Sequence, residues 1–145
     1  MLNTEVSRDL GRLETAPQLA RLWLTSRMDQ LGIADRLSGD ARERVRLMAS
    51  ELVTNVVLHT RSSNAVITLR IGPTSVTVTV ADDADQLPKL CHERTVLDGS
   101  GRGLRIVEAL SAEWGVDRVR QGGKRVWFMV AFDLGFHPSR TAFRQ

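Results

Sequence analysis

The order of apolar and polar residues divides the chain into helical and strand-like segments. Between residues 16 and 31 apolar side chains recur at close to helical spacing, and Gly32 ends the segment, which predicts a first helix. A second helix is expected from about Ala41 to His59. Asp40 is a good N-cap for it, and Glu43 three residues later forms something close to a capping box.

Alternation replaces the helical period after the second helix. Four segments place their apolar side chains on one face and predict strands at residues 65–71, 76–80, 114–118 and 126–132. Turn residues at 72–74 and at 121–124 join them into two antiparallel hairpins. A third helix is expected from Leu104 to about Leu110, between the hairpins.

This order of elements predicts an α+β fold. We expect a two-layer α/β sandwich, with a mostly antiparallel, mixed sheet and helices on one face. The length of 145 residues and the 42% hydrophobic content fit one globular domain. We assign it to residues 15–134, preceded by an N-terminal arm or edge strand at 1–14 and followed by a disordered tail at 135–145.

A row of polar residues borders the apolar stripe of the second helix. The stripe consists of Val45, Met48, Leu52 and Val56. Glu51, Asn55 and His59 repeat every four residues, and a step of four turns the helix by only about 40°, so the three form one inclined row. A carboxylate and a carboxamide beside a core-facing stripe predict a ligand between this helix and the rest of the domain. His59 is interpreted as a helix-end residue near the C-terminal dipole.

Two further polar features flank a segment without clear periodicity at 86–100. The valine-rich strand ends in Ala81-Asp82-Asp83-Ala84-Asp85, and Gly99-Ser-Gly101-Arg-Gly103 opens the third helix. Backbone N–H groups at a helix N-terminus, free of bulky side chains, suit a phosphate. Neither a dinucleotide fingerprint nor a P-loop fits, because no strand directly precedes these glycines and the P-loop lysine and hydroxyl are missing.

Composition argues against several other classes of protein. The single cysteine, Cys91, argues against a disulfide framework and a zinc site. The twenty basic residues are interspersed with seventeen acidic ones, so the net charge of +3 does not predict direct nucleic-acid binding. The longest apolar run, Val126–Phe132, is too short to cross a bilayer, and no apolar leader precedes residue 20. We expect a cytoplasmic protein without a membrane partner.

The polar features together resemble the four sequence boxes of the GHKL, or Bergerat-fold, ATPases. The matching strings are Glu51-x-x-x-Asn55, Asp82 after the valine-rich strand, Gly101-x-Gly103 before a helix, and Gly122-Gly123-Lys124-Arg125-Val126-Trp127-Phe128 on the last hairpin. Within this superfamily the chain is similar to the small bacterial anti-sigma-factor serine kinases, over about residues 10–133.

The resemblance implies that ATP and Mg²⁺ are bound. It assigns Glu51 as the general base, Asn55 as the magnesium ligand, and Asp82 as the acceptor of a hydrogen bond from the adenine amino group. The remaining nucleotide-binding residues that it implies lie near the phosphates: Gly99, Gly101, Gly103 and, as a candidate, Arg102. The resemblance also implies that the segment 89–100 is the mobile lid of the nucleotide site.

The resemblance also implies partners. We expect a serine/threonine protein kinase that binds a sigma factor, phosphorylates an anti-anti-sigma (STAS-type) protein and regulates transcription by partner switching. Exposed apolar surface on the first helix permits a homodimer.

Two departures from the family pattern leave an alternative open. In the family, glycines usually follow the aspartate, but here Asp82 is followed by Asp83-Ala84-Asp85. The hydroxyl residue often found in the last box is replaced at Lys124-Arg125. The alternative is a non-catalytic module that sequesters a partner with or without nucleotide gating.

Overall fold

The strand segments form one sheet because their side chains alternate between a buried and a more exposed position, as a sheet covered on one face requires. The computed structural model describes residues 4–84 and 102–133. In chain order its elements are β1 (Thr4–Asp9), α1 (Ala16–Gln30), the 3₁₀ helix η1 (Ile33–Asp35), α2 (Gly39–His59), β2 (Val66–Ile71), β3 (Ser75–Asp82), α3 (Arg102–Leu110), β4 (Glu113–Arg118) and β5 (Lys124–Ala131).

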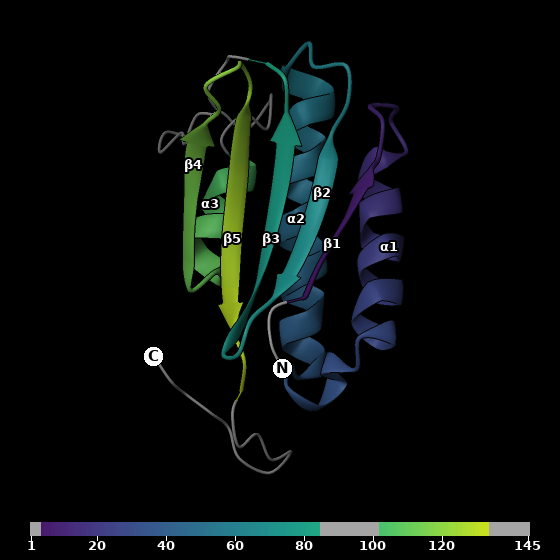
Figure 1. The fold of residues 1–145 in the computed structure, drawn as a ribbon, viewed down its shortest axis with the longest axis vertical. Helices are drawn as coiled ribbons and strands as arrows, with labels where there is room; N and C mark the ends of the chain where they lie inside the picture. The colour runs from purple at the N-terminus through teal and green to yellow at the C-terminus, as the bar shows by residue number, and fades with distance from the viewer. Residues whose placement is uncertain (1–3, 85–101, 134–145) are drawn as a thin grey trace.

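The five strands lie in the order β1-β2-β3-β5-β4, and each neighbouring pair is antiparallel. Helices α2 and α3 lie against one face of this sheet, and α1 packs beside α2 (Figure 1). The predicted α+β sandwich is therefore confirmed. The sheet is antiparallel at every pairing in the described part of the chain, where the sequence predicted a mostly antiparallel, mixed one.

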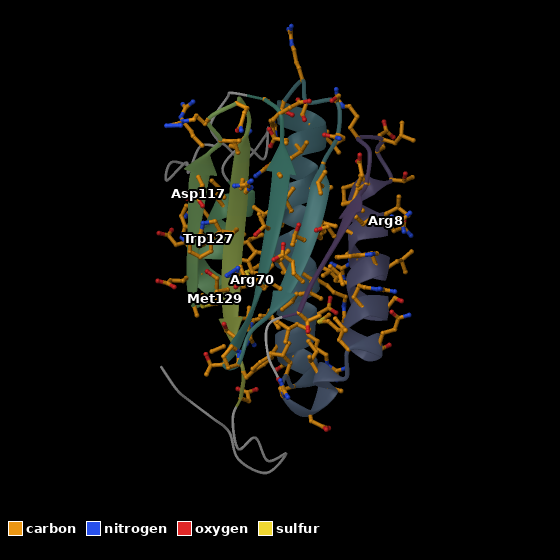
Figure 2. All side chains as sticks on the ribbon, in the orientation of Figure 1. Arg8, Arg70, Asp117, Trp127 and Met129 are labelled. Atoms are coloured by element: carbon orange, nitrogen blue, oxygen red, sulfur yellow. The ribbon has the colours of Figure 1, made fainter. Side chains whose placement is uncertain are left out.

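The core lies between the sheet and its helical layer. Leu69, Val78 and Phe128 are opposite one another on β2, β3 and β5, and all three are fully buried. The predicted stripe of α2 faces them, since Val45, Met48, Leu52 and Val56 are all buried. The other face of the sheet carries polar and partly exposed side chains, including Arg70, Asp117, Trp127 and Met129 (Figure 2).

The start of α2 differs from the prediction. Ser38 is the N-cap: its backbone is extended, and its Oγ accepts a hydrogen bond from the N–H of Ala41 at 3.1 Å. Asp40 already belongs to the first helical turn, where its charge favours the positive end of the helix dipole. The prediction was wrong by two residues, because Ser38 and Asp40 are both good caps and the sequence does not rank them.

The N-terminal segment contributes an edge strand to the sheet. β1 pairs with β2 from Thr4↔Ile71 to Asp9↔Val66, and Ser7 and Thr68 share a hydrogen bond of 2.8 Å on the open face. Among the helices in the described ranges, none has the length and apolarity that crossing a bilayer demands.

Candidate functional site

The polar row of α2 divides in two. Glu51 and Asn55 are half-buried, whereas His59 is exposed in the last turn of the helix. Gly103 of α3 lies against Glu51 and Asn55, whereas His59 is exposed in the last turn of α2. The row therefore offers two functional groups toward α3 and one toward solvent.

Gly103, in the first turn of α3, lies directly on Glu51 and Asn55. A Cβ atom added to Gly103 would lie 3.2 Å from Glu51 Oε1, 3.3 Å from Glu51 Cβ and 3.5 Å from Asn55 Nδ2. The two contacts with Glu51 are tight, so a side chain at this position would require its neighbours to shift by a few tenths of an ångström. The structure thus brings together three residues that the sequence assigned to two separate boxes, and it does so through the packing of α3 on α2.

A buried ion pair lies at the end of the sheet where β3 finishes and β5 begins. Asp82 and Lys124 are opposite each other in the β3–β5 register, and Lys124 Nζ donates a hydrogen bond of 2.9 Å to Asp82 Oδ1. Their side chains are 1% and 4% exposed, respectively. The N–H of Ala84 donates a second hydrogen bond to the same oxygen at 2.9 Å. Asp82 Oδ2, in contrast, is buried and accepts no hydrogen bond from the described part of the chain.

The turn before β5 holds this pair in place. Gly123 has φ of +91°, and a Cβ added there would lie 2.3 Å from the carbonyl oxygen of Asp82 and 2.8 Å from Asp83 Cα. Both atoms belong to backbone, which cannot move aside as a side chain can. Only glycine fits here, and its absence of a side chain allows the turn to approach the end of β3 closely.

The second acid after β3 has a structural role. Asp83 accepts hydrogen bonds from Ser63 Oγ at 2.6 Å and from the N–H of Ser63 at 3.2 Å, while its own N–H donates to the buried Ser62 Oγ at 2.9 Å. The side chain of Ser63, and after it the side chain of Ser62, lower the pKa of the Asp83 carboxyl below its ordinary value of 3.8. Asp83 is engaged by the α2–β2 connection, and Asp82 is the acid with an oxygen left for a ligand.

Sequence reasoning missed Lys124. It was noted in the turn at 121–124, in the last sequence box and as a place where an expected hydroxyl is lost, but no role was assigned to its side chain, which is buried against Asp82. The available signal was the alternation of β5, since residue 124 shares its face with Val126 and Phe128, which point into the core. Gly99, Gly101 and the proposed lid at 89–100 lie outside the described residues, as does the side chain of Arg102.

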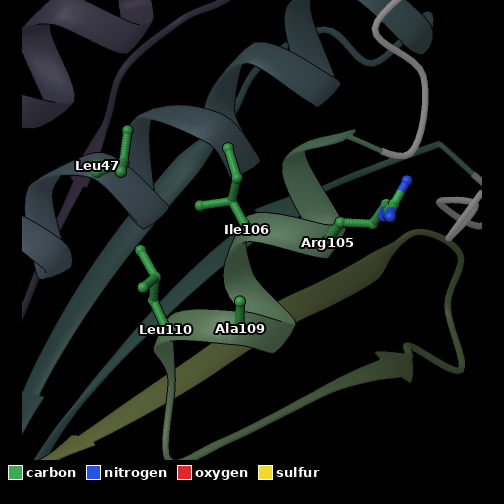
Figure 3. A pocket seen from close by; sticks show the side chains of 5 residues that line it. All are labelled: Leu47, Arg105, Ile106, Ala109 and Leu110. Atoms are coloured by element: carbon green, nitrogen blue, oxygen red, sulfur yellow. The ribbon is translucent and has the colours of Figure 1, made fainter. Parts of the chain in front are cut away.

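A groove of about 400 Å³ runs between α2 and α3 and is lined by Leu47, Arg105, Ile106, Ala109 and Leu110 (Figure 3). Leu47 precedes Glu51 by one helical turn, and Ile106 follows Gly103 by one turn. The groove therefore continues the α2–α3 contact away from the polar pair. Its lining is mainly apolar and includes none of the predicted site residues, so it is separate from the candidate nucleotide site.

The residues present fit a nucleotide bound with magnesium. The Asn55 carboxamide can offer one neutral oxygen to a hard cation that keeps most of its water. The start of α3 offers backbone N–H groups and the positive end of a helix dipole, with only hydrogen as the Gly103 side chain. Asp82 Oδ2 accepts no hydrogen bond from residues 4–84 or 102–133, so it can accept one from a ligand, and a buried acceptor left unpaired is costly.

An antiparallel sheet with a helical layer on one face fits an ATPase domain of the GHKL type. The chain belongs to the family described as histidine kinase-like ATPase domain, whose profile matches residues 12–130. The resemblance to the GHKL superfamily that the sequence boxes indicated is thus confirmed. Membership in an ATPase family implies that the chain binds ATP.

Solved structures share the fold, and one of them does so at low sequence identity. The chain resembles the crystal structure of the RsbU and RsbW domains of Rv1364c from Mycobacterium tuberculosis, with a TM-score of 0.66 and 17% identity. The likeness covers 89% of this chain and 32% of that chain. No protein of curated function matches the sequence.

Proposed function

We propose that this chain is an anti-sigma-factor-like regulator with serine/threonine protein kinase activity that depends on Mg-ATP. Its substrate in this proposal is a serine of an anti-anti-sigma (STAS-type) protein, and phosphorylation switches the chain between that protein and a sigma factor. The observation that carries the proposal is the contact of Gly103 with Glu51 and Asn55. Membership in the histidine kinase-like ATPase family and the likeness to an RsbW domain support it.

Each residue of the contact has a distinct role in the proposal. Asn55 holds the magnesium ion through its carboxamide oxygen, and the start of α3 at Gly103 binds phosphate through backbone N–H groups. Mg-ATP supplies the phosphoryl group. Glu51 accepts the proton of the partner's serine hydroxyl as the serine oxygen bonds to the γ-phosphorus, and the bond from this phosphorus to the bridging oxygen breaks, which leaves ADP.

The test compares three variants on one helix face. Purified protein is incubated with Mg-ATP and a STAS-type protein, and phosphoserine is quantified by mass spectrometry. Glu51→Gln keeps the side-chain shape but removes the base, so transfer should fall by about 10² to 10⁴ while ATP affinity is retained. Asn55→Ala should weaken nucleotide binding only when Mg²⁺ is present. His59→Ala, on the same row but exposed, is the control and should match the wild type.

The outcomes separate the kinase from the non-catalytic alternative. Phosphoserine formation that is unchanged in Glu51→Gln contradicts the assignment of the base. ATP binding without transfer to any serine favours a nucleotide-gated module that sequesters its partner. Calorimetry that detects neither ATP nor ADP would leave sequestration without a nucleotide.

A further inference from the structure

The buried ion pair between β3 and β5 presents both a hydrogen-bond acceptor and a hydrogen-bond donor. Asp82 Oδ2 is bare, and Lys124 Nζ has three N–H donors of which one is used by Asp82 Oδ1 within the described part of the chain. The two side chains are adjacent because their residues are opposite each other in the register. A ligand edge that carries a donor next to an acceptor would satisfy both.

We propose that Lys124 is a specificity-determining residue that reads N1 of the adenine ring. The inference rests on the proposed binding of ATP. In it the adenine 6-amino group donates to Asp82 Oδ2, and Lys124 Nζ donates to the neighbouring N1. Lys124 also fixes Asp82, because its bond to Oδ1, together with that of the Ala84 N–H, leaves Oδ2 as the oxygen that faces the base.

The chemistry of the edge explains why a lysine and an aspartate suit adenine. The Watson–Crick edge of adenine places a donor, the amino group, beside an acceptor, N1. Guanine presents the reverse order, with the O6 acceptor beside the N1–H donor. An aspartate alone selects the amino group but leaves N1 unread, so a lysine beside it adds a second contact. This second contact takes the place of the hydroxyl residue that the last sequence box lacks.

The neighbouring charged residues do not serve this purpose. Asp83 is engaged by Ser62 and Ser63 of the α2–β2 connection. Arg125 follows Lys124 on β5 but lies on the opposite face of the sheet and is exposed. Of these groups at the end of β3 and the start of β5, Asp82 and Lys124 are the pair that is buried toward the helical layer.

The test uses nucleotide analogues that remove one atom's contact at a time. Calorimetry gives the Kd of ATP and of GTP. It also gives the Kd of purine riboside triphosphate, which lacks the 6-amino group, and of 1-deaza-ATP, which has C–H in place of N1. The 7-deaza analogue, which retains the Watson–Crick edge, serves as the control. Each nucleotide is measured with the wild type and with Lys124→Met. Arg125→Met is the matched control, because it also removes one positive charge from β5 but on the opposite face of the sheet.

The inference predicts a specific coupling between one atom and one residue. In the wild type and in Arg125→Met, 1-deaza-ATP should bind about 10-fold to 100-fold more weakly than ATP, the range expected for a hydrogen bond to a charged group. In Lys124→Met this difference should vanish, whereas the penalty for loss of the 6-amino group should persist. If Lys124→Met does not fold, the double variant Asp82→Leu with Lys124→Met takes its place. It leaves no unpaired charge and removes both hydrogen-bonding groups, so it should lose both preferences.

The contrary outcomes are distinct. Tight binding of 1-deaza-ATP by the wild type, or an equal penalty in Lys124→Met, overturns the role of Lys124 while ATP binding stands. Preference for GTP over ATP overturns the assigned order of donor and acceptor. Failure to bind ATP and 7-deaza-ATP alike overturns the proposed function and this inference with it.

Discussion

Replacement of Gly103 by alanine should separate catalysis from folding. The new Cβ would lie 3.2 Å from Glu51 Oε1 and 3.3 Å from Glu51 Cβ, so the neighbours must yield by a few tenths of an ångström. The carboxylate oxygen is the free end of a flexible side chain and can move. Glu51 Cβ is tied to the α2 backbone, so relief of the second contact also requires a small separation of α2 and α3.

Two opposing terms set the effect on stability. Alanine in place of a helical glycine gains about 0.8 to 1.0 kcal/mol of helix propensity. Overpacking of a close contact costs about 1 to 3 kcal/mol. The difference predicts a loss of no more than about 2 kcal/mol, and so a folded variant.

Catalysis is more sensitive, since a displacement on the order of 1 Å at a reacting group can cost about 10²-fold in rate. A smaller shift of Glu51 should slow phosphoryl transfer by about tenfold or more.

The assay measures stability and transfer on the same preparation. Urea denaturation gives the free energy of unfolding, calorimetry gives the ATP affinity, and phosphoserine on a STAS-type protein gives the rate. Gly39→Ala is the matched control, since Gly39 is also helical but has nothing within 4 Å of an added Cβ. A transfer rate in Gly103→Ala equal to that of this control, with no loss of stability, would refute the close contact and the role of Glu51 derived from it.

Three further variants, with Arg125→Met as a control, test the β3–β5 end of the site, each by urea denaturation. Lys124→Met should cost about 3 to 5 kcal/mol because it leaves a buried carboxylate unpaired, while the exposed Arg125→Met should cost little; equal costs would contradict the burial of the pair. Gly123→Ala should cost more than about 1 kcal/mol, because its φ is +91° and its Cβ meets backbone. Ser63→Ala should destabilise near neutral pH. The pKa of Asp83 is lowered on folding, so its stabilisation is present above the ordinary value of 3.8 and is lost as pH falls through the folded value, and the variant and wild-type curves should converge in acid.

The elements could be predicted because their periods are unambiguous. The stripe of α2 and the alternation of β3 and β5 each specify one buried face, and a shift of register would expose it. The weaker predictions lie where two residues compete for one role. Ser38 and Asp40 are both good N-caps. Which of them forms the cap depends on the backbone conformation between η1 and α2, which the sequence pattern does not specify.

The candidate site could be predicted only in part. Glu51 and Asn55 follow from helical geometry within one element, and their spacing is fixed by four residues along α2. Their contact with Gly103 depends on the packing of α3, which no local pattern specifies. Lys124 was missed for the same reason, because its partner lies on another strand and is set by the β3–β5 register.

The two halves of the site are held by different contacts, so mutations in one half should act independently of mutations in the other. The Asp82–Lys124 half depends on a cross-strand ion pair, and the Glu51–Asn55 half depends on helix packing against Gly103. The two halves share no residue, and changes at independent sites add in free energy. A double variant of Lys124→Met and Gly103→Ala should therefore combine the loss of base discrimination from one change with the loss of transfer rate from the other. In each assay, the free-energy change of the double variant should equal the sum of the changes in the two single variants. A departure from that sum by more than about 0.5 kcal/mol would show that the bound nucleotide couples the sheet end to the α2–α3 contact.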